Sequence, residues 1–416
     1  MAFTFGTRRA IYANITEQTS KVPSWPTLGE LEHFELLDRV YRSLCALLFN
    51  YVPQSGHPGG SISSGRFAQA LVFDALDYDF SDPDREDADV ISYAAGHKAM
   101  GLYSLWALRD ELVRISDPSM LPADFRYRLR LEDLLGFRRN PTTQTPLFRE
   151  LGIRALDGHP TPATPYVRLS TGASGVGVAS SIGLALGARD WYGRNAPRVH
   201  IVEGEGGLTP GRVAEALAAA ATSGLDNVFL HLDWNQASID SNRVCREGDV
   251  PGDYVQWNPM ELFYLHDWNV VYVPDGRDFR QILGAQRFAA RIENGQPTAI
   301  IYRTIKGWKY GIEGRASHGA GHKLCSDGFF QAIAELTGPQ NVKLPTCEAG
   351  KQRCMLETGG TSILEECFHE ALGVVRQTLA QLRGALTILT ITHQTGLVDI
   401  ADRVYRLENG AAVRQP

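Results

Sequence analysis

The chain has 416 residues, of which 44% are hydrophobic, and a formal net charge of −6. This length allows one large or two medium globular domains, and the negative charge argues against general nucleic-acid binding, which needs a basic surface. The sequence contains no run of about 18 apolar residues, which is the length that a membrane span needs. The N-terminal segment is not typical of a secretion signal, and the six dispersed cysteines are typical of a reduced protein, so we expect a cytoplasmic location.

The hydrophobic periodicity predicts alternating helices and strands over residues 1 to 340. Residues 1 to 30 show little periodicity, and we expect them to form an arm on the surface. The predicted helices are 28–51, 66–76, 99–112, 131–135, 178–192, 212–223, 257–265 and 279–294. The predicted strands are 89–94, 198–202, 227–232, 268–273 and 297–302. This alternation predicts an α/β fold, with a parallel sheet flanked by helices.

One stretch, Arg198 to Asp240, organises the rest of the chain. It is predicted to form a strand, a glycine-rich turn over 204–207, a helix and a second strand. Because ligands bind beyond the carboxyl ends of parallel strands, we expect Glu205 and Asn235 to lie side by side at that edge. With the backbone carbonyl of Ala237, they form an all-oxygen donor set. Such a set suits Mg²⁺ or Ca²⁺ carrying a diphosphate.

The sequence Gly204-Glu205-Gly206, followed thirty positions later by Asn235, resembles the thiamine-diphosphate motif Gly-Asp-Gly…Asn. Within that group, about the first 330 residues resemble the N-terminal, diphosphate-binding half of a transketolase. The chain departs from the family pattern at Glu205, where the family has aspartate. The longer side chain keeps the charge but moves it by one methylene.

Four histidines stand in motifs that resemble those of the family. His57 lies in Ser-Gly-His-Pro-Gly, His97 follows Gly96, His159 lies in Gly-His-Pro, and His318 lies in Ser-His-Gly-Ala. The resemblance implies that all four line the catalytic channel. Each alone is also compatible with a structural role, but imidazoles are the side chains that best exchange protons with sugar hydroxyls near neutral pH.

A second glycine-rich turn resembles the family's Thr-Gly-Pro-Leu-Gly stretch, which wraps over the cofactor. The resemblance implies a thiamine diphosphate site made by Gly172, Ala173, Ser174, Gly175, Gly204, Gly206 and Asn235, and a metal site made by Glu205, Asn235 and Ala237. Lys98 replaces a small family residue, Arg315 replaces a histidine, and Pro210 replaces a glutamate. Lys306 is expected either to contact the same anion or to point to solvent.

The C-terminal part changes character. Residues 341–361 are polar and turn-rich and are predicted to be a linker, and 362–416 are predicted to form a small α/β appendage. Its predicted elements are a helix over 363–382, a strand over 386–393, a helix over 396–403 and a hairpin over 404–413. The strand that ends at His393 resembles the end of an ABC-transporter ATPase domain. The sequence has no phosphate-binding loop, so we expect a fusion remnant or docking appendage and no ATPase activity.

The family resemblance implies thiamine-diphosphate-dependent transfer of a two-carbon ketol unit from a ketose to an aldehyde. The part after residue 340 is too short for the pyrimidine-binding domain that completes such a site. We therefore expect a split transketolase, completed by a separate C-terminal subunit in an α₂β₂ assembly, with small sugars as substrates. Three alternatives stay open: a deoxyxylulose-phosphate synthase, a 2-oxo acid dehydrogenase α subunit and a non-catalytic scaffold protein.

Overall fold

The computed structural model describes residues 6–52, 56–138, 145–314, 321–337, 363–380, 405–408 and 411–414. Its contacts divide the chain into two compact units, Met1–Arg383 and Gly384–Pro416. Every predicted site residue except His318 lies in a described part of the first unit. His318 and Arg315 lie outside the described residues.

The first unit is built on a six-stranded sheet whose strands are all parallel, in the order β1-β5-β6-β4-β3-β2. The strands are β1 Tyr12–Asn14, β2 Val90–Tyr93, β3 Val199–Gly204, β4 Val228–Trp234, β5 Asn269–Val273 and β6 Thr298–Arg303. All seven residues of the central strand β4 are buried, as expected for a parallel sheet that is covered on both faces. The predicted α/β fold is confirmed.

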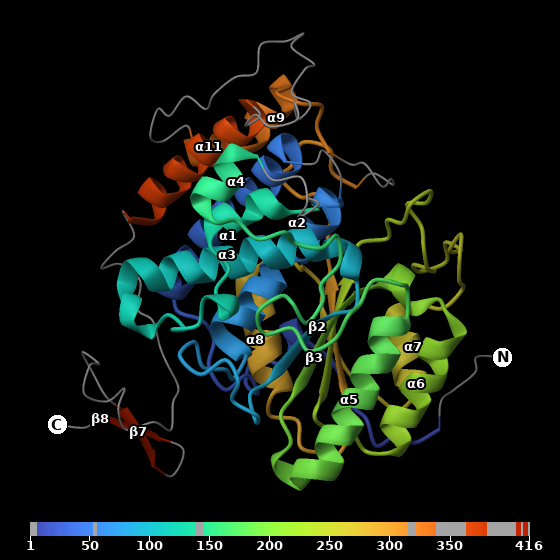
Figure 1. Cartoon of the computed structure of the whole chain (residues 1–416). Coiled ribbons are helices and arrows are strands. Elements are labelled where there is room, and N and C mark those ends of the chain that lie inside the picture. Colours follow the sequence, from blue (N-terminus) through green and yellow to red (C-terminus); the bar gives the residue numbers. More distant parts are fainter. Residues whose placement is uncertain are drawn as a thin grey trace. The chain divides into compact units, whose positions relative to one another are not determined.

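Helices cover both faces of this sheet (Figure 1). One face carries α5 Val176–Tyr192, α6 Gly211–Thr222 and α7 Pro259–Leu265. The other carries α2 Pro58–Ala70 and α8 Phe279–Ala289, with α1 Leu28–Tyr51 and α3 Ala99–Ser116 packed on α2. The shorter helical elements are η1 Ile15–Glu17, η2 Leu71–Ala75, η3 Gly96–Lys98, η4 Pro118–Met120, η5 Phe125–Tyr127, η6 Leu131–Gly136, α4 Pro146–Leu151, η7 Gly193–Asn195, η8 Glu205–Leu208, α9 Asp327–Ala332 and α10 Ala334–Thr337.

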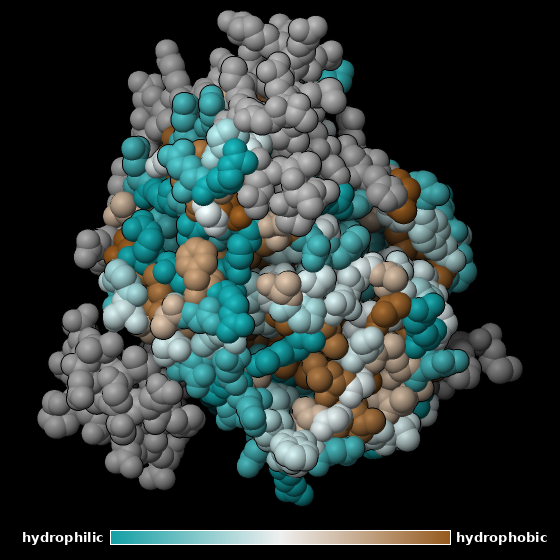
Figure 2. Space-filling model, viewed as in Figure 1, coloured by the Kyte–Doolittle hydropathy of each residue, from teal (hydrophilic) through white to brown (hydrophobic). Residues whose placement is uncertain are grey.

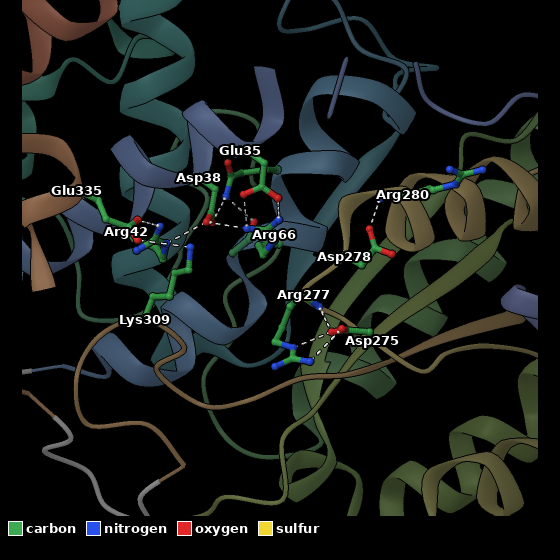
Figure 3. Close-up of polar contacts among 12 residues, drawn as sticks. Glu35, Asp38, Arg42, Arg66, Asp275, Arg277, Asp278, Arg280, Lys309 and Glu335 are labelled. Atoms are coloured by element: carbon green, nitrogen blue, oxygen red, sulfur yellow. Dashed lines mark hydrogen bonds and ion pairs between the residues drawn. The ribbon is translucent and has the colours of Figure 1, made fainter. Parts of the chain in front are cut away.

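A buried ion-pair network holds α1, α2 and α10 together (Figure 3). The fully buried Asp38 of α1 accepts from Arg42 at 2.9 Å and from Arg66 of α2 at 2.9 Å. Arg42 also contacts Glu335 of α10 at 2.8 Å. The Arg66 guanidinium lies 3.9 Å from the ring centroid of Phe279, at the start of α8. These contacts fix the position of α2, whose N-cap residue is His57.

Apolar side chains form a buried cluster against the sheet and an exposed area on the surface. A buried cluster between the sheet and α5, α6 and α7 contains Val178, Val213, Leu217 and Phe263. An exposed apolar area lies over α5 (Figure 2), where Leu186 is 42% exposed. Exposed apolar areas of this kind commonly mark contacts with other chains.

Two parts of the chain differ from their predicted organisation. The N-terminal arm contains the edge strand β1, which pairs with β5 and is too short to show a periodic pattern. Helix α11, Ile363–Ala380, belongs to the first unit and not to a separate appendage that begins at residue 362. Its apolar face is buried and contacts α1, α3 and η6, and Arg376 lies 3.3 Å from Glu111 of α3. The helical stripe was visible in the sequence, but the surface it packs against was not.

The second unit contains an antiparallel hairpin of β7 Tyr405–Glu408 and β8 Ala411–Arg414, as predicted. The predicted linker over 341–361, the strand over 386–393 and the helix over 396–403 lie outside the described residues. Among the helices that the structure describes, none is long and apolar enough to cross a membrane.

Candidate functional site

Glu205 and Asn235 meet at the carboxyl edge of the sheet, as predicted. Strands β3 and β4 pair in parallel with Gly204 opposite Asp233, so the residues that follow both strands lie at the same edge. The backbone N–H of Asn235 donates to Oε2 of Glu205 at 3.3 Å. The parallel register of β3 and β4 therefore brings together Glu205 and Asn235, which are thirty positions apart in the sequence.

The oxygen atoms of this pair fit a hard cation. The Oε1 atom of Glu205 is buried and has no hydrogen-bond partner among the described residues. The amide of Asn235 donates through Nδ2 to Asp233 at 2.9 Å and to Ser63 at 3.2 Å, which orients Oδ1 to the other side, where it accepts from the N–H of Ala237 at 2.9 Å. A buried carboxylate oxygen and an oriented amide oxygen are the kind of ligands that Mg²⁺ and Ca²⁺ bind.

Burial perturbs the two carboxyl groups at the end of β3. Burial, followed by the nearby charge of Asp233, raises the pKa of Glu205 to about 8. Burial also raises the pKa of Glu203 to about 7, although the N–H of Gly204 donates to its Oε1 at 2.8 Å. Such shifts are typical of sites where a charged partner is expected.

The glycines leave space for a ligand beside these oxygens. A Cβ added at Gly206 would meet no atom within 4 Å, and at Gly204 the nearest would be Nζ of Lys98 at 3.7 Å. Gly172, with φ +151°, could not carry a Cβ, because that atom would lie 2.9 Å from Cδ2 of His159. A Cβ at Gly96 would lie 2.6 Å from Cα of Gly172. The close approach of these backbones therefore requires glycine.

The Gly172–Gly175 turn lies beside the start of α6. Gly175 is the N-cap of α5 with φ +76°, and a Cβ there would lie 2.8 Å from Val213 and 3.1 Å from Pro210. Ala173 and Ser174, between the two glycines, are exposed. The structure thus brings the second predicted glycine turn next to the element that follows the first one.

Three of the four predicted histidines lie together. The rings of His57 and His97 are 5.0 Å apart between centroids and nearly perpendicular. Cδ2 of His159 would lie 3.0 Å from a Cβ added at Gly96 and 2.9 Å from one added at Gly172, so its ring lies beside both glycines. Burial, followed by the charges of Lys98 and His57, holds the pKa of His97 well below its usual range, and burial followed by Arg138 lowers the pKa of His159. Both shifts favour the neutral ring over the imidazolium.

Three further polar residues of the site were not singled out from the sequence: Ser63, Asp233 and Thr304. Asp233 is fully buried and accepts from Ser63 at 2.6 Å, from Lys98 at 2.6 Å and from the hydroxyl of Thr304. One sequence signal was present, because Asp233 stands two positions before Asn235 and alternate strand residues share a face. The serine and threonine come from distant elements and carried no signal.

The fold and this edge define the class of protein: an open parallel α/β domain with polar residues and glycine turns at its strand ends, where such domains bind ligands. The family model described as transketolase, thiamine diphosphate binding domain, matches residues 125–332, which are 208 of the 416 residues. The chain belongs to the transketolase family, as predicted.

Curated relatives agree with this assignment, and a solved structure shares the fold. Transketolase-like protein 2 of Mus musculus is 30% identical over 253 residues, which cover 61% of this chain and 34% of that protein. Transketolase 2 of Escherichia coli (strain K12) is 30% identical over 262 residues, which cover 61% and 34%. The structure resembles transketolase from Leishmania mexicana, with a TM-score of 0.58 and 22% identity over 84% of this chain and 46% of that one. The chain thus spans about a third of the length of these curated relatives.

Proposed function

We propose that this chain is the diphosphate-binding subunit of a split transketolase-like enzyme. It binds thiamine diphosphate with Mg²⁺ or Ca²⁺ and, with a separate pyrimidine-binding subunit in an α₂β₂ assembly, transfers a two-carbon ketol unit from a ketose to an aldehyde in the cytoplasm. The observation that carries the proposal is the meeting of Glu205 and Asn235 beside two glycine turns and three histidines.

Each group of residues has a binding task. Glu205, the side-chain oxygen of Asn235 and the carbonyl of Ala237 hold the cation, and Asp233 keeps the Asn235 amide in the orientation that presents its oxygen. Gly204, Gly206 and the Gly172–Gly175 turn let the diphosphate approach the backbone. Thiamine diphosphate, when bound, supplies the nucleophile that cleaves a carbon–carbon bond of the sugar.

The histidines handle protons. Burial lowers the pKa of His97 and of His159 and so favours their neutral rings, and each neutral ring has a nitrogen that can accept a hydrogen bond, and in the reaction a proton, from a substrate hydroxyl. His57 lies against His97 and orients it from the N-terminus of α2. His318 is proposed to act in the same channel on the strength of its motif.

Two observations support a partner subunit. The first is the family match itself, because it covers the diphosphate-binding domain, and the proposed reaction also needs a pyrimidine-binding domain. The exposed apolar area over α5 offers a surface on which another chain can pack.

Isothermal titration calorimetry with thiamine diphosphate and Mg²⁺ tests the cofactor assignment. We expect saturable one-site binding by the wild type, and at least a tenfold weaker affinity in Asn235→Ala and in Glu205→Ala. Glu215→Ala, an exposed change on α6, is the matched control and keeps the wild-type affinity.

Wild-type affinity in the two site variants would refute the placement of the cation. Absence of wild-type binding, both alone and with a co-expressed pyrimidine-binding subunit, would favour the non-catalytic scaffold.

A further inference from the structure

Lys98 projects into the diphosphate site although its side chain is buried. The residue is 2% exposed and lies between α2 and the end of β3. A Cβ added at Gly60 of α2 would lie 3.5 Å from its Cε, and a Cβ at Gly204 would lie 3.7 Å from its Nζ. The side chain therefore runs past α2 and places its ammonium group at the Gly204–Gly206 turn.

The contacts of Asp233 hold this ammonium in place. Nζ of Lys98 donates to Oδ2 of Asp233 at 2.6 Å, but the same carboxylate also accepts from Ser63, Asn235 and Thr304. Asp233 is thus stabilised by three neutral donors besides the lysine. An ammonium has three N–H donors, so Lys98 can keep its contact with Asp233 and also donate to an anion on the turn.

A second lysine, Lys306, is influenced by the charge of Lys98. Lys306 is buried, and its pKa is lowered first by burial and then by the charge of Lys98. Lys98 also contributes to the lowered pKa of His97. Fixed charges in a buried site interact more strongly with a ligand than the same charges in water.

We propose that Lys98 is a built-in cation of the diphosphate site, so that this chain binds a diphosphate group even without a divalent metal ion. The inference rests on the proposed function for the identity of the cofactor, but it concerns any diphosphate at the Gly204–Gly206 turn. A site with a small residue at position 98 would have to take that positive charge from the metal.

The test is calorimetric titration of the full chain with inorganic pyrophosphate in EDTA. Removing Lys98 alone would leave Asp233 without its charged partner, so the informative comparison is Asp233→Asn against the double variant Lys98→Met/Asp233→Asn. Lys98→Arg keeps the charge. Lys309→Met, at a lysine 3.4 Å from Glu335 in the ion-pair network of Figure 3, is the matched control. Circular dichroism and thermal melting confirm that each variant is folded.

We expect the wild type, Asp233→Asn, Lys98→Arg and Lys309→Met to bind pyrophosphate without metal, and the double variant to bind at least tenfold more weakly than Asp233→Asn. Two results would overturn the inference: no wild-type binding in EDTA, or equal affinities of Asp233→Asn and the double variant. Absence of wild-type binding in EDTA overturns the inference even if a variant fails to fold, and Lys98→Arg then provides the second comparison at the same position.

A parallel titration with thiamine diphosphate and Mg²⁺ separates this inference from the proposed function. Thiamine diphosphate binding with Mg²⁺ but no pyrophosphate binding in EDTA leaves the function standing and overturns the role of Lys98. Pyrophosphate binding in EDTA without thiamine diphosphate binding, both alone and with a co-expressed pyrimidine-binding subunit, keeps the role of Lys98 and removes thiamine diphosphate as the cofactor.

Discussion

Glu205→Gln is expected to stabilise the metal-free protein, increasingly so as the pH rises. The carboxyl group of Glu205 is buried, and its pKa is raised from 4.5 to about 8. Between these values the unfolded chain has already lost the proton that the folded chain still holds, so the folded state binds more protons and its stability falls as the pH rises. Glutamine imitates the protonated acid and removes this loss.

The magnitude follows from the shift. Each pKa unit corresponds to about 1.4 kcal/mol, so the free energy of unfolding of Glu205→Gln minus that of the wild type should grow by about 4 kcal/mol between pH 5 and pH 8. The difference should vanish near pH 4 and level off above pH 8. Glu203 remains in both proteins, so its own titration largely cancels.

Urea unfolding in EDTA at four or five pH values, followed by tryptophan fluorescence, measures this difference. Glu215→Gln, on the exposed face of α6, is the matched control, and its difference from the wild type should not change with pH. A pH-independent difference for Glu205→Gln would mean that the carboxyl group is not buried as the structure places it, and the account of the cation site would fail with it.

Three further results are expected. Gly172→Ala should lower the free energy of unfolding by about 1–3 kcal/mol and weaken thiamine diphosphate binding, because the new Cβ meets the His159 ring at a φ that disfavours alanine; Gly183→Ala on α5, where a Cβ meets no atom within 4 Å, should not be destabilising in the same urea assay. Arg66→Met should cost about 3 kcal/mol in that assay, because it leaves the buried Asp38 with one arginine fewer; a cost near zero would contradict a buried pair. The His97 ring should stay neutral when the pH falls from 8 to 6 in two-dimensional NMR, and a midpoint at or above 6.5 would contradict its burial beside Lys98.

Much of the fold was readable from local patterns. Helix α1 begins and ends at the predicted residues, and β3, α6 and β4 lie within two residues of their predicted bounds, because continuous apolar strands and amphipathic helices leave a periodic record. Helix α2 began eight residues before its prediction, at Pro58. Its glycine- and serine-rich first turns carry a weak helical signal and are stabilised by burial against α1 and α3.

The site residues also fall into those that the sequence could predict and those that it could not. Residues that act through a local motif, such as Glu205, Asn235, Gly172 and His97, could be proposed from the sequence, because each motif sits at the end of a predicted strand or the start of a predicted helix. The orientation of Lys98 could not, since a lysine at that position points to solvent or into the site depending on the space that Gly60 and Gly204 leave for it.

The amino-acid sequence by itself determined the α/β class, the edge of the sheet that carries the site and the family of the chain, because these depend on periodicity and spacing. Only the tertiary structure decided that Ser63, Lys98 and Thr304 converge on Asp233, and that α11 packs on the first unit. The physical reason is that contacts between distant elements depend on how helices and strands pack in three dimensions. No local pattern in the chain records which buried donor will face which buried carboxylate.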